Sequence, residues 1–185
     1  MKDVEISSPV SFPVHVARLP QKGLPVVFEA DEKQRAALAE AHGLDAVERF
    51  RIELLVTAWK RNGVRVEGRV EADIVQTCVV TLDPVRNHIS EEVSGLFLPQ
   101  DSKLARLGFE TGGEILLDAE GPDSPELFSG DTVDVGAFAE EFFGLGIDPY
   151  PRKSGVSLQA AADDESDEPV EGELQRKLRS LLDKS

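Results

Sequence analysis

Hydrophobic and polar residues alternate with a period of two over residues 49–98. In the first run the apolar residues stand at Phe50, Ile52, Leu54, Val56 and Ala58. In the second run they stand at Val64, Val66, Val70, Ala72 and Ile74. A period of two is typical of strands that bury one face. The pattern therefore predicts two long strands that share an apolar face.

Two turn signals divide this region into strands. Asn62-Gly63 separates the two runs, and this dipeptide favours a two-residue type I′ turn between antiparallel strands. Asp83-Pro84 predicts a second turn, after which VRNHISEEVSGLFL returns as a third strand. No helix fits between these strands, which excludes a doubly wound parallel sheet here. We expect an α+β fold, in which an antiparallel β-meander of long strands packs with a few helices.

Two segments outside the meander carry helix signals. In DEKQRAALAEAHG, Asp31 and Gln34 have the spacing of a capping box, and Gly43 can end the helix. In DTVDVGAFAEEFFGLG, Asp134 can cap a helix whose apolar residues recur at helical spacing. The prolines within residues 4–28 favour short extended or edge segments there.

Composition divides the chain into three parts. We expect residues 1–155 to form one α+β domain, residues 156–170 a flexible acidic linker, and residues 171–185 a short amphipathic helix with a leucine stripe. Within the domain, residues 99–131 are rich in glycine, proline and acids. The apolar island GEILLDAEG predicts a short strand in that region.

The chain has 185 residues, of which 41% are hydrophobic, and this is enough for one core. It has a single cysteine, so no internal disulfide can form, and its first residues lack the apolar run of a signal peptide. No stretch approaches the length of an apolar membrane span. We therefore expect a bacterial cytoplasmic protein that does not contact the membrane.

The formal net charge is −15, and the acidic excess lies in residues 90–148, which hold 2 Lys/Arg and 14 Asp/Glu. A segment of this charge repels phosphate. The acids can serve solubility alone. The other interpretation is a docking surface for a basic protein, with Glu91 and Glu92 as the candidate contacts.

Two basic groups are the candidates for contact with RNA phosphates. Lys60, Arg61 and Arg65 stand at the predicted hairpin tip, and Arg152 and Lys153 follow the second helix. Trp59 and Tyr150 adjoin these groups, where they can stack on bases or belong to the core and its rim. Five cations make a modest patch, and surface solubility is the alternative explanation. We expect no binding to DNA.

The single cysteine lies in QTCVVTLDPV, where Thr81 replaces the second cysteine of a C-x-x-C pair. Cys78 continues the period of two from Ile74, so its side chain should point to the buried side. A zinc site needs three further ligands, and His88 is the one obvious candidate in the meander. We therefore expect a buried apolar cysteine, no metal site and no cofactor.

The sequence contains no P-loop, G-x-G-x-x-G, H-E-x-x-H or G-x-S-x-G motif, and its three histidines lie far apart. The acidic region offers carboxylates for a Mg²⁺ site, namely Glu114, Asp118, Asp131 and Asp134. Solvated acids in loops explain the same residues. Since no catalytic signature is present, we expect a protein that is not an enzyme.

Three segments, in their order along the chain, resemble the YceD family of large ribosomal RNA subunit accumulation proteins. They are QTCVVTLDPV leading into a long strand, the acidic stretch with its ILLD island, and the helix closing in DPYPRKSG. The resemblance covers about residues 12–155. Many members of that family carry C-x-x-C where this chain has Cys78 and Thr81, which implies that thiol or zinc chemistry is dispensable to the family's work.

The resemblance implies a role in producing or maintaining large-subunit ribosomal RNA. We expect a non-enzymatic ribosome biogenesis factor that meets the assembling large subunit through a basic ribosomal protein or through precursor rRNA. The alternative is a metal-dependent RNA-processing nuclease that uses the acidic residues of 110–134.

Overall fold

The computed structural model describes residues 8–102 and 125–155. A sheet of five strands has the order β2-β3-β4-β5-β6. Its strands are β2 (Leu24–Glu29), β3 (Ala46–Trp59), β4 (Gly63–Thr77), β5 (Pro84–Pro99) and β6 (Glu126–Phe128). β2 to β5 pair as an antiparallel meander, and β6 pairs in parallel with the end of β5. The predicted α+β meander of long strands is therefore confirmed, and the parallel strand β6 is an addition to it.

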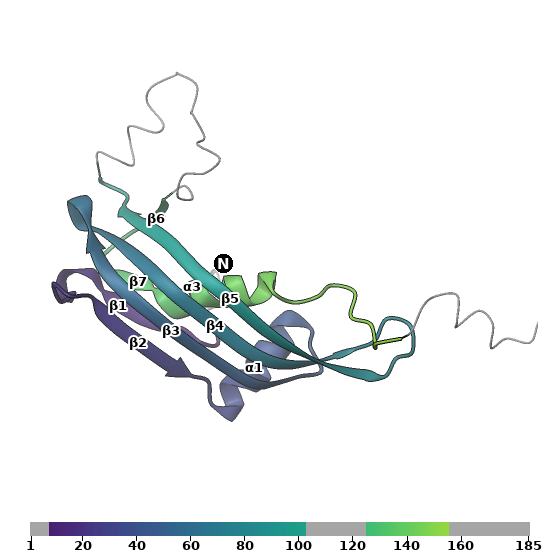
Figure 1. The fold of residues 1–185 in the computed structure, drawn as a ribbon. Coiled ribbons are helices and arrows are strands. Elements are labelled where there is room, and N and C mark those ends of the chain that lie inside the picture. The colour runs from purple at the N-terminus through teal and green to yellow at the C-terminus, as the bar shows by residue number, and fades with distance from the viewer. Residues whose placement is uncertain (1–7, 103–124, 156–185) are drawn as a thin grey trace, which may run out of the picture.

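The remaining elements lie beside this sheet (Figure 1). They are β1 (Pro13–His15), β7 (Thr132–Asp134), the 3₁₀ turns η1 (Val16–Arg18) and η2 (Lys60–Asn62), and the helices α1 (Glu32–His42) and α3 (Val135–Leu145). β1 and β7 form a separate antiparallel pair. This pair joins the N-terminal segment to the residues just before α3, so two distant parts of the sequence enter one layer.

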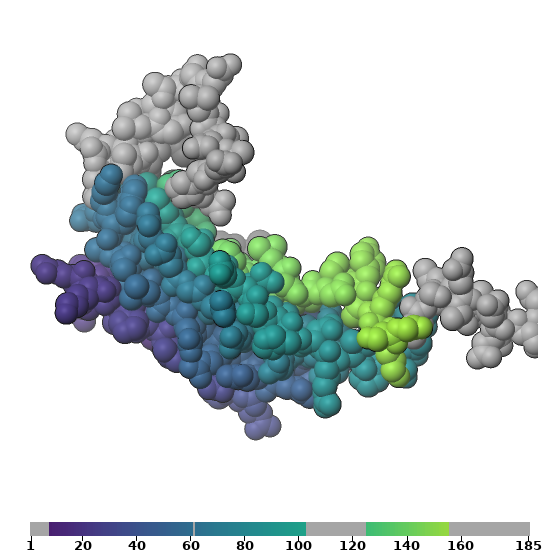
Figure 2. All heavy atoms as spheres, viewed as in Figure 1, coloured from purple at the N-terminus to yellow at the C-terminus, as the bar shows by residue number. Residues whose placement is uncertain are grey.

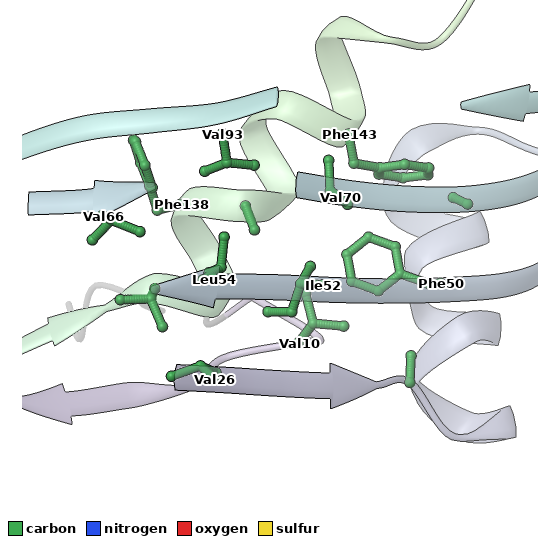
Figure 3. Packing of buried hydrophobic residues seen from close by; sticks show 14 of the residues in the cluster. Val10, Val26, Phe50, Ile52, Leu54, Val66, Val70, Val93, Phe138 and Phe143 are labelled. Carbon is green, nitrogen blue, oxygen red and sulfur yellow. The ribbon is translucent and has the colours of Figure 1, made fainter. Parts of the chain in front are cut away.

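The apolar face of the sheet forms the core beneath the two helices. The predicted alternation holds through Phe50, Ile52, Leu54 and Val56 on β3, all of which are buried. The ring of Phe143 on α3 packs edge to face on Phe50, with 5.4 Å between ring centroids, and Figure 3 shows both rings between sheet and helices. The pattern predicts Ala58 on this face too, but Ala58 is exposed because it lines a cavity at this end of the sheet, although its β4 partner Val64 is buried.

The predicted type I′ turn at Asn62-Gly63 is wrong in its register. Trp59 pairs with Gly63, so the loop between them has three residues. Asn62 has a φ of 61° and Gly63 a φ of −75°, whereas a type I′ turn needs positive φ at both central residues. The left-handed conformation therefore falls on Asn62 at the end of a one-turn 3₁₀ segment, which asparagine tolerates better than most residues.

Both helices begin as their sequences predict. The Asp31 side chain accepts a hydrogen bond from the backbone N–H of Gln34 at 2.8 Å, and the Gln34 side-chain oxygen accepts one from the backbone N–H of Asp31 at 3.0 Å. Gly43 ends α1 in the left-handed conformation, with a φ of 64°. Asp134 caps α3, since its carboxylate accepts from the backbone N–H groups of Gly136 and Ala137.

The opposite face of the sheet is polar and no described helix covers it (Figures 1 and 2). Its charges alternate across strands, with Arg51 opposite Glu71 and Glu53 opposite Arg69. Opposite charges in directly paired positions stabilise a solvated sheet face. The predicted strand in GEILLDAEG, the acidic linker 156–170 and the helix 171–185 fall outside the described residues.

Candidate functional site

The basic hairpin tip holds one aromatic residue, Trp59. Lys60 Nζ lies 5.8 Å from the centroid of the Trp59 ring, which is within the range of a cation–π contact. Arg65 Nη1 lies 3.8 Å from Glu67 Oε1 on the same strand. Arg61 belongs to the same turn. One of the tip cations is thus held beside an aromatic ring and another beside a carboxylate.

Arg152 and Lys153 lie at the other end of the sheet, beside the turn that joins β4 to β5 (Figure 1). Lys153 Nζ donates to Asp83 Oδ2 at 3.0 Å, and this hydrogen bond and charge hold the pKa of the Asp83 carboxyl below its usual range. β4 spans the distance between the two basic groups, and its 15 residues correspond to about 45 Å. The five candidate cations therefore do not form one patch.

Tyr150 is the aromatic residue beside this second group. It is exposed, and its backbone N–H donates to Asp148 Oδ1 at 2.9 Å. Tyr150 therefore lies at the surface rather than in the core.

Cys78 is buried in the β4–β5 turn, as its position in the period of two predicts. Its Sγ accepts from the backbone N–H of Thr81 at 3.5 Å and from that of Lys153 at 3.4 Å. Hydrogen bonds lower the pKa of the thiol to about 6, with the Thr81 side chain as the largest cause and the N–H groups of Thr81, Lys153 and Val80 after it. The site favours a thiolate, yet the sulfur has no exposed surface, so its contacts are structural.

The carboxylates proposed for a Mg²⁺ site are not assembled in the described part of the chain. Asp134 Oδ1 accepts from the backbone N–H of Phe12 at 2.8 Å in addition to capping α3. Asp131 Oδ2 lies 3.4 Å from His15 Nδ1. Glu114 and Asp118 lie outside the described residues. Among residues 8–102 and 125–155 no group of three or more His, Cys, Asp or Glu side chains could hold a metal ion.

Glu91 and Glu92 are both exposed but lie on opposite faces of β5. Glu92 pairs with Arg69 on the polar face, whereas Glu91 pairs with the inward-facing Val70 and lies beside Gly146 at the end of α3. Successive side chains of a strand point to opposite faces. These two docking candidates therefore belong to two different surfaces.

A cavity of about 400 Å³ opens beside the hairpin tip, and the sequence analysis did not predict it. It is lined by η1, the β3–β4 turn, the end of β5 and the β6–β7 connection, which meet at one end of the sheet (Figure 1). Trp59 and Phe128 are its aromatic lining residues, and Asp101 and Asp131 are its carboxylates. The position of Asp131 is fixed because its backbone carbonyl accepts from the N–H of Val16 at 2.9 Å.

The model of the family described as "Large ribosomal RNA subunit accumulation protein YceD" matches residues 66–180, which is more than half of the chain. This chain belongs to the YceD family. A search of curated proteins and a search of solved structures found no significant match. The YceD match includes Cys78, both glutamates of β5 and the α3 helix, whereas the hairpin tip from Trp59 to Arg65 lies before it.

In residues 8–102 and 125–155, no helix combines the length and the apolar character that crossing a membrane requires.

Proposed function

We propose that this YceD-family protein supports the accumulation of large-subunit ribosomal RNA as a non-enzymatic binding factor that docks on a basic ribosomal protein. The observation that carries the proposal is that two of its candidate RNA-binding cations are already paired with carboxylates. Arg65 and Lys153 each lie beside a carboxylate of this same chain, and about 45 Å of sheet separates the two groups.

This arrangement weakens direct contact with RNA. A phosphate would compete with Glu67 for Arg65 and with Asp83 for Lys153. Affinity for a nucleic acid backbone grows with the number of phosphates that are neutralised, and separated cations contact few phosphates at once.

The acidic charge favours a basic partner instead. The described acids of residues 90–148 occur on both faces of β5, around the cavity and along α3. Glu126 and Glu141 line one surface depression together. Burial raises the pKa of Glu126, and the charge of Glu141 raises it to a smaller extent. Carboxylates placed this close gain from the approach of a cationic partner, because it relieves their mutual repulsion.

The hydrogen bonds of Asp134 also support a binding role over a Mg²⁺-dependent reaction. Its carboxylate accepts from the N–H groups of Phe12, Gly136 and Ala137. A carboxylate already occupied by three backbone donors is poorly suited to hold Mg²⁺ as well. The residue thus stabilises a helix start rather than a reaction.

A binding experiment with the full-length protein separates protein docking from RNA contact. Immobilised protein is offered purified large-subunit ribosomal proteins and, separately, naked large-subunit rRNA, each over a series of salt concentrations. We expect capture of at least one basic ribosomal protein and weak retention of naked RNA. Tight, salt-sensitive binding of the naked RNA without capture of any ribosomal protein would reject the proposal.

Two sets of variants identify the surface in use. The triple variant Lys60→Ala, Arg61→Ala, Arg65→Ala should leave protein capture unchanged. If RNA binds there directly, the salt dependence of RNA binding should instead flatten by up to about 2 to 3 units. The matched control is Lys22→Ala, Lys33→Ala, Arg86→Ala, which removes the same charge from exposed positions elsewhere. Since Glu91 and Glu92 lie on opposite faces of β5, the single variants Glu91→Gln and Glu92→Gln report which face the partner contacts.

A further inference from the structure

We propose that the cavity beside the β3–β4 turn binds an arginine side chain of a basic protein, with Trp59 as the flat surface and Asp101 and Asp131 as the carboxylates. The inference rests on the proposed function, because it names a contact through which a basic ribosomal protein would dock. It assigns the docking site to the hairpin tip rather than to the acids of β5.

The shape of the cavity fits a long side chain. Its volume of about 400 Å³ lies at the lower end of the range typical of small-ligand sites. Val16 and Phe128 line it with apolar surface, which suits the methylene stem of an arginine.

The chemistry of the cavity fits a guanidinium group. The Trp59 ring already has a cation near it, since Lys60 Nζ lies 5.8 Å from the ring centroid. Arginine stacks on aromatic faces and also forms paired hydrogen bonds with carboxylates. Asp131 is available for such bonds because 75% of its side chain is exposed and its recorded ion pair, to His15, is long at 3.4 Å.

The same residues disfavour an RNA ligand at this position. A base could stack on Trp59, but its phosphates would approach the negative charges of Asp101 and Asp131. A cation is attracted by both the ring and the carboxylates, and only Lys60, which already lies near the ring, opposes it. Charge complementarity therefore selects a basic peptide segment over a nucleic acid.

Fluorescence offers a direct test, because Trp59 is the single tryptophan of the chain. The full-length protein is titrated with a short peptide of alternating arginine and glycine. The reference peptide carries citrulline, which is uncharged and similar in shape, at every arginine. We expect saturable changes in tryptophan emission with the arginine peptide and none with the citrulline peptide.

Matched double variants test the carboxylates. The double variant Asp101→Asn, Asp131→Asn should lower the affinity for the arginine peptide about tenfold, as expected for the loss of charge-assisted contacts. The control, Glu48→Gln with Asp73→Asn, removes the same charge from exposed residues paired with Arg86 and His88. It should change the affinity less than twofold. Equal losses in the two double variants would mean general attraction to an acidic protein and would overturn the proposal.

Lys60→Ala should affect the affinity for the two kinds of ligand differently. Removing this lysine frees the Trp59 ring from its own cation, so the arginine peptide should bind equally well or more tightly. If RNA binds at the tip, the same change should weaken RNA binding. Quenching of Trp59 by a single-stranded RNA oligonucleotide but not by the arginine peptide would overturn the proposal.

Capture of ribosomal proteins separates this inference from the proposed function. If the Asp101→Asn, Asp131→Asn variant loses the ribosomal protein that the natural protein captures, the cavity is the docking site. If the variant captures it unchanged, the inference is wrong while the proposed function stands. If the natural protein captures none, the proposed function fails, whereas arginine binding in the cavity is still decided by fluorescence.

Discussion

The backbone N–H of Lys153 donates a hydrogen bond to Sγ of Cys78 at 3.4 Å, across a separation of 75 positions in the sequence. Next to it, the N–H of Val79 donates to the carbonyl of Pro151 at 2.9 Å. These two bonds attach the segment after α3 to the β4–β5 turn. Cys78 thus serves as an anchoring point for the DPYPRK segment.

The titration of Cys78 should make stability depend on pH. The pKa of the thiol is about 6 in the folded protein and 9.0 without these contacts, so folding favours the thiolate. The resulting stabilisation is fully present above pH 9 and is lost as the pH falls through about 6. The midpoint of urea unfolding should therefore rise between these pH values. Cys78→Ser should remove this rise, because serine does not titrate there; an unchanged rise would assign it to another group.

The thiolate can be observed directly. Following its ultraviolet absorbance during a pH titration of the folded protein should give an apparent pKa near 6 for Cys78. Thr81→Val removes the largest of the causes that lower this pKa, so the apparent value should move upwards in that variant. A native titration near the ordinary thiol value would contradict the hydrogen-bonded arrangement.

We predict that the purified protein holds no stoichiometric zinc. Cys78 has Thr81 in place of a second thiol, and the described residues near it accept or donate hydrogen bonds instead of forming a ligand set. Elemental analysis should give well under one zinc per chain, and a strong chelator should leave the melting temperature unchanged. A content of about one zinc per chain would contradict this prediction.

Gly136 at the start of α3 should not tolerate a side chain. A Cβ there would lie 1.9 Å from the backbone oxygen of Val10, so the N-terminal segment would have to move. Gly136→Ala should lower the free energy of unfolding by about 1–3 kcal/mol. Gly144→Ala in the same helix is the control, because its Cβ would meet no atom closer than 3.4 Å. That variant should be neutral or stabilised by up to about 1 kcal/mol, since alanine is the better helix former.

Asp134→Ala should cost more stability than Asp31→Ala. Each aspartate caps a helix, and losing a cap costs about 0.5–2 kcal/mol. Asp134 also accepts from the N–H of Phe12 and the hydroxyl of Ser11, so its loss also weakens the attachment of the N-terminal segment. Chemical denaturation of both variants gives the comparison, and equal losses would show that the bonds to residues 11 and 12 contribute little.

The sequence by itself determined the elements that depend on near neighbours. The buried face of β3 follows from a period of two, and the start of α1 follows from Asp31 and Gln34, three positions apart. Such features are encoded locally, because backbone geometry and capping involve residues within one or two turns. Even here the Asn62-Gly63 turn differed from expectation, since the pairing of Trp59 with Gly63 made the loop one residue longer than the dipeptide favours.

Tertiary structure decided which distant residues share a site. The pairing of β1 with β7 brings Asp131 beside His15, and the end of β5 places Asp101 near Trp59 at the same cavity. The same sheet keeps Lys60 and Lys153 at opposite ends, so the two candidate groups of RNA contacts are far apart. Composition counts charges but does not place them. Their distances depend on strand length and on long-range pairing, which the packing of the whole core selects.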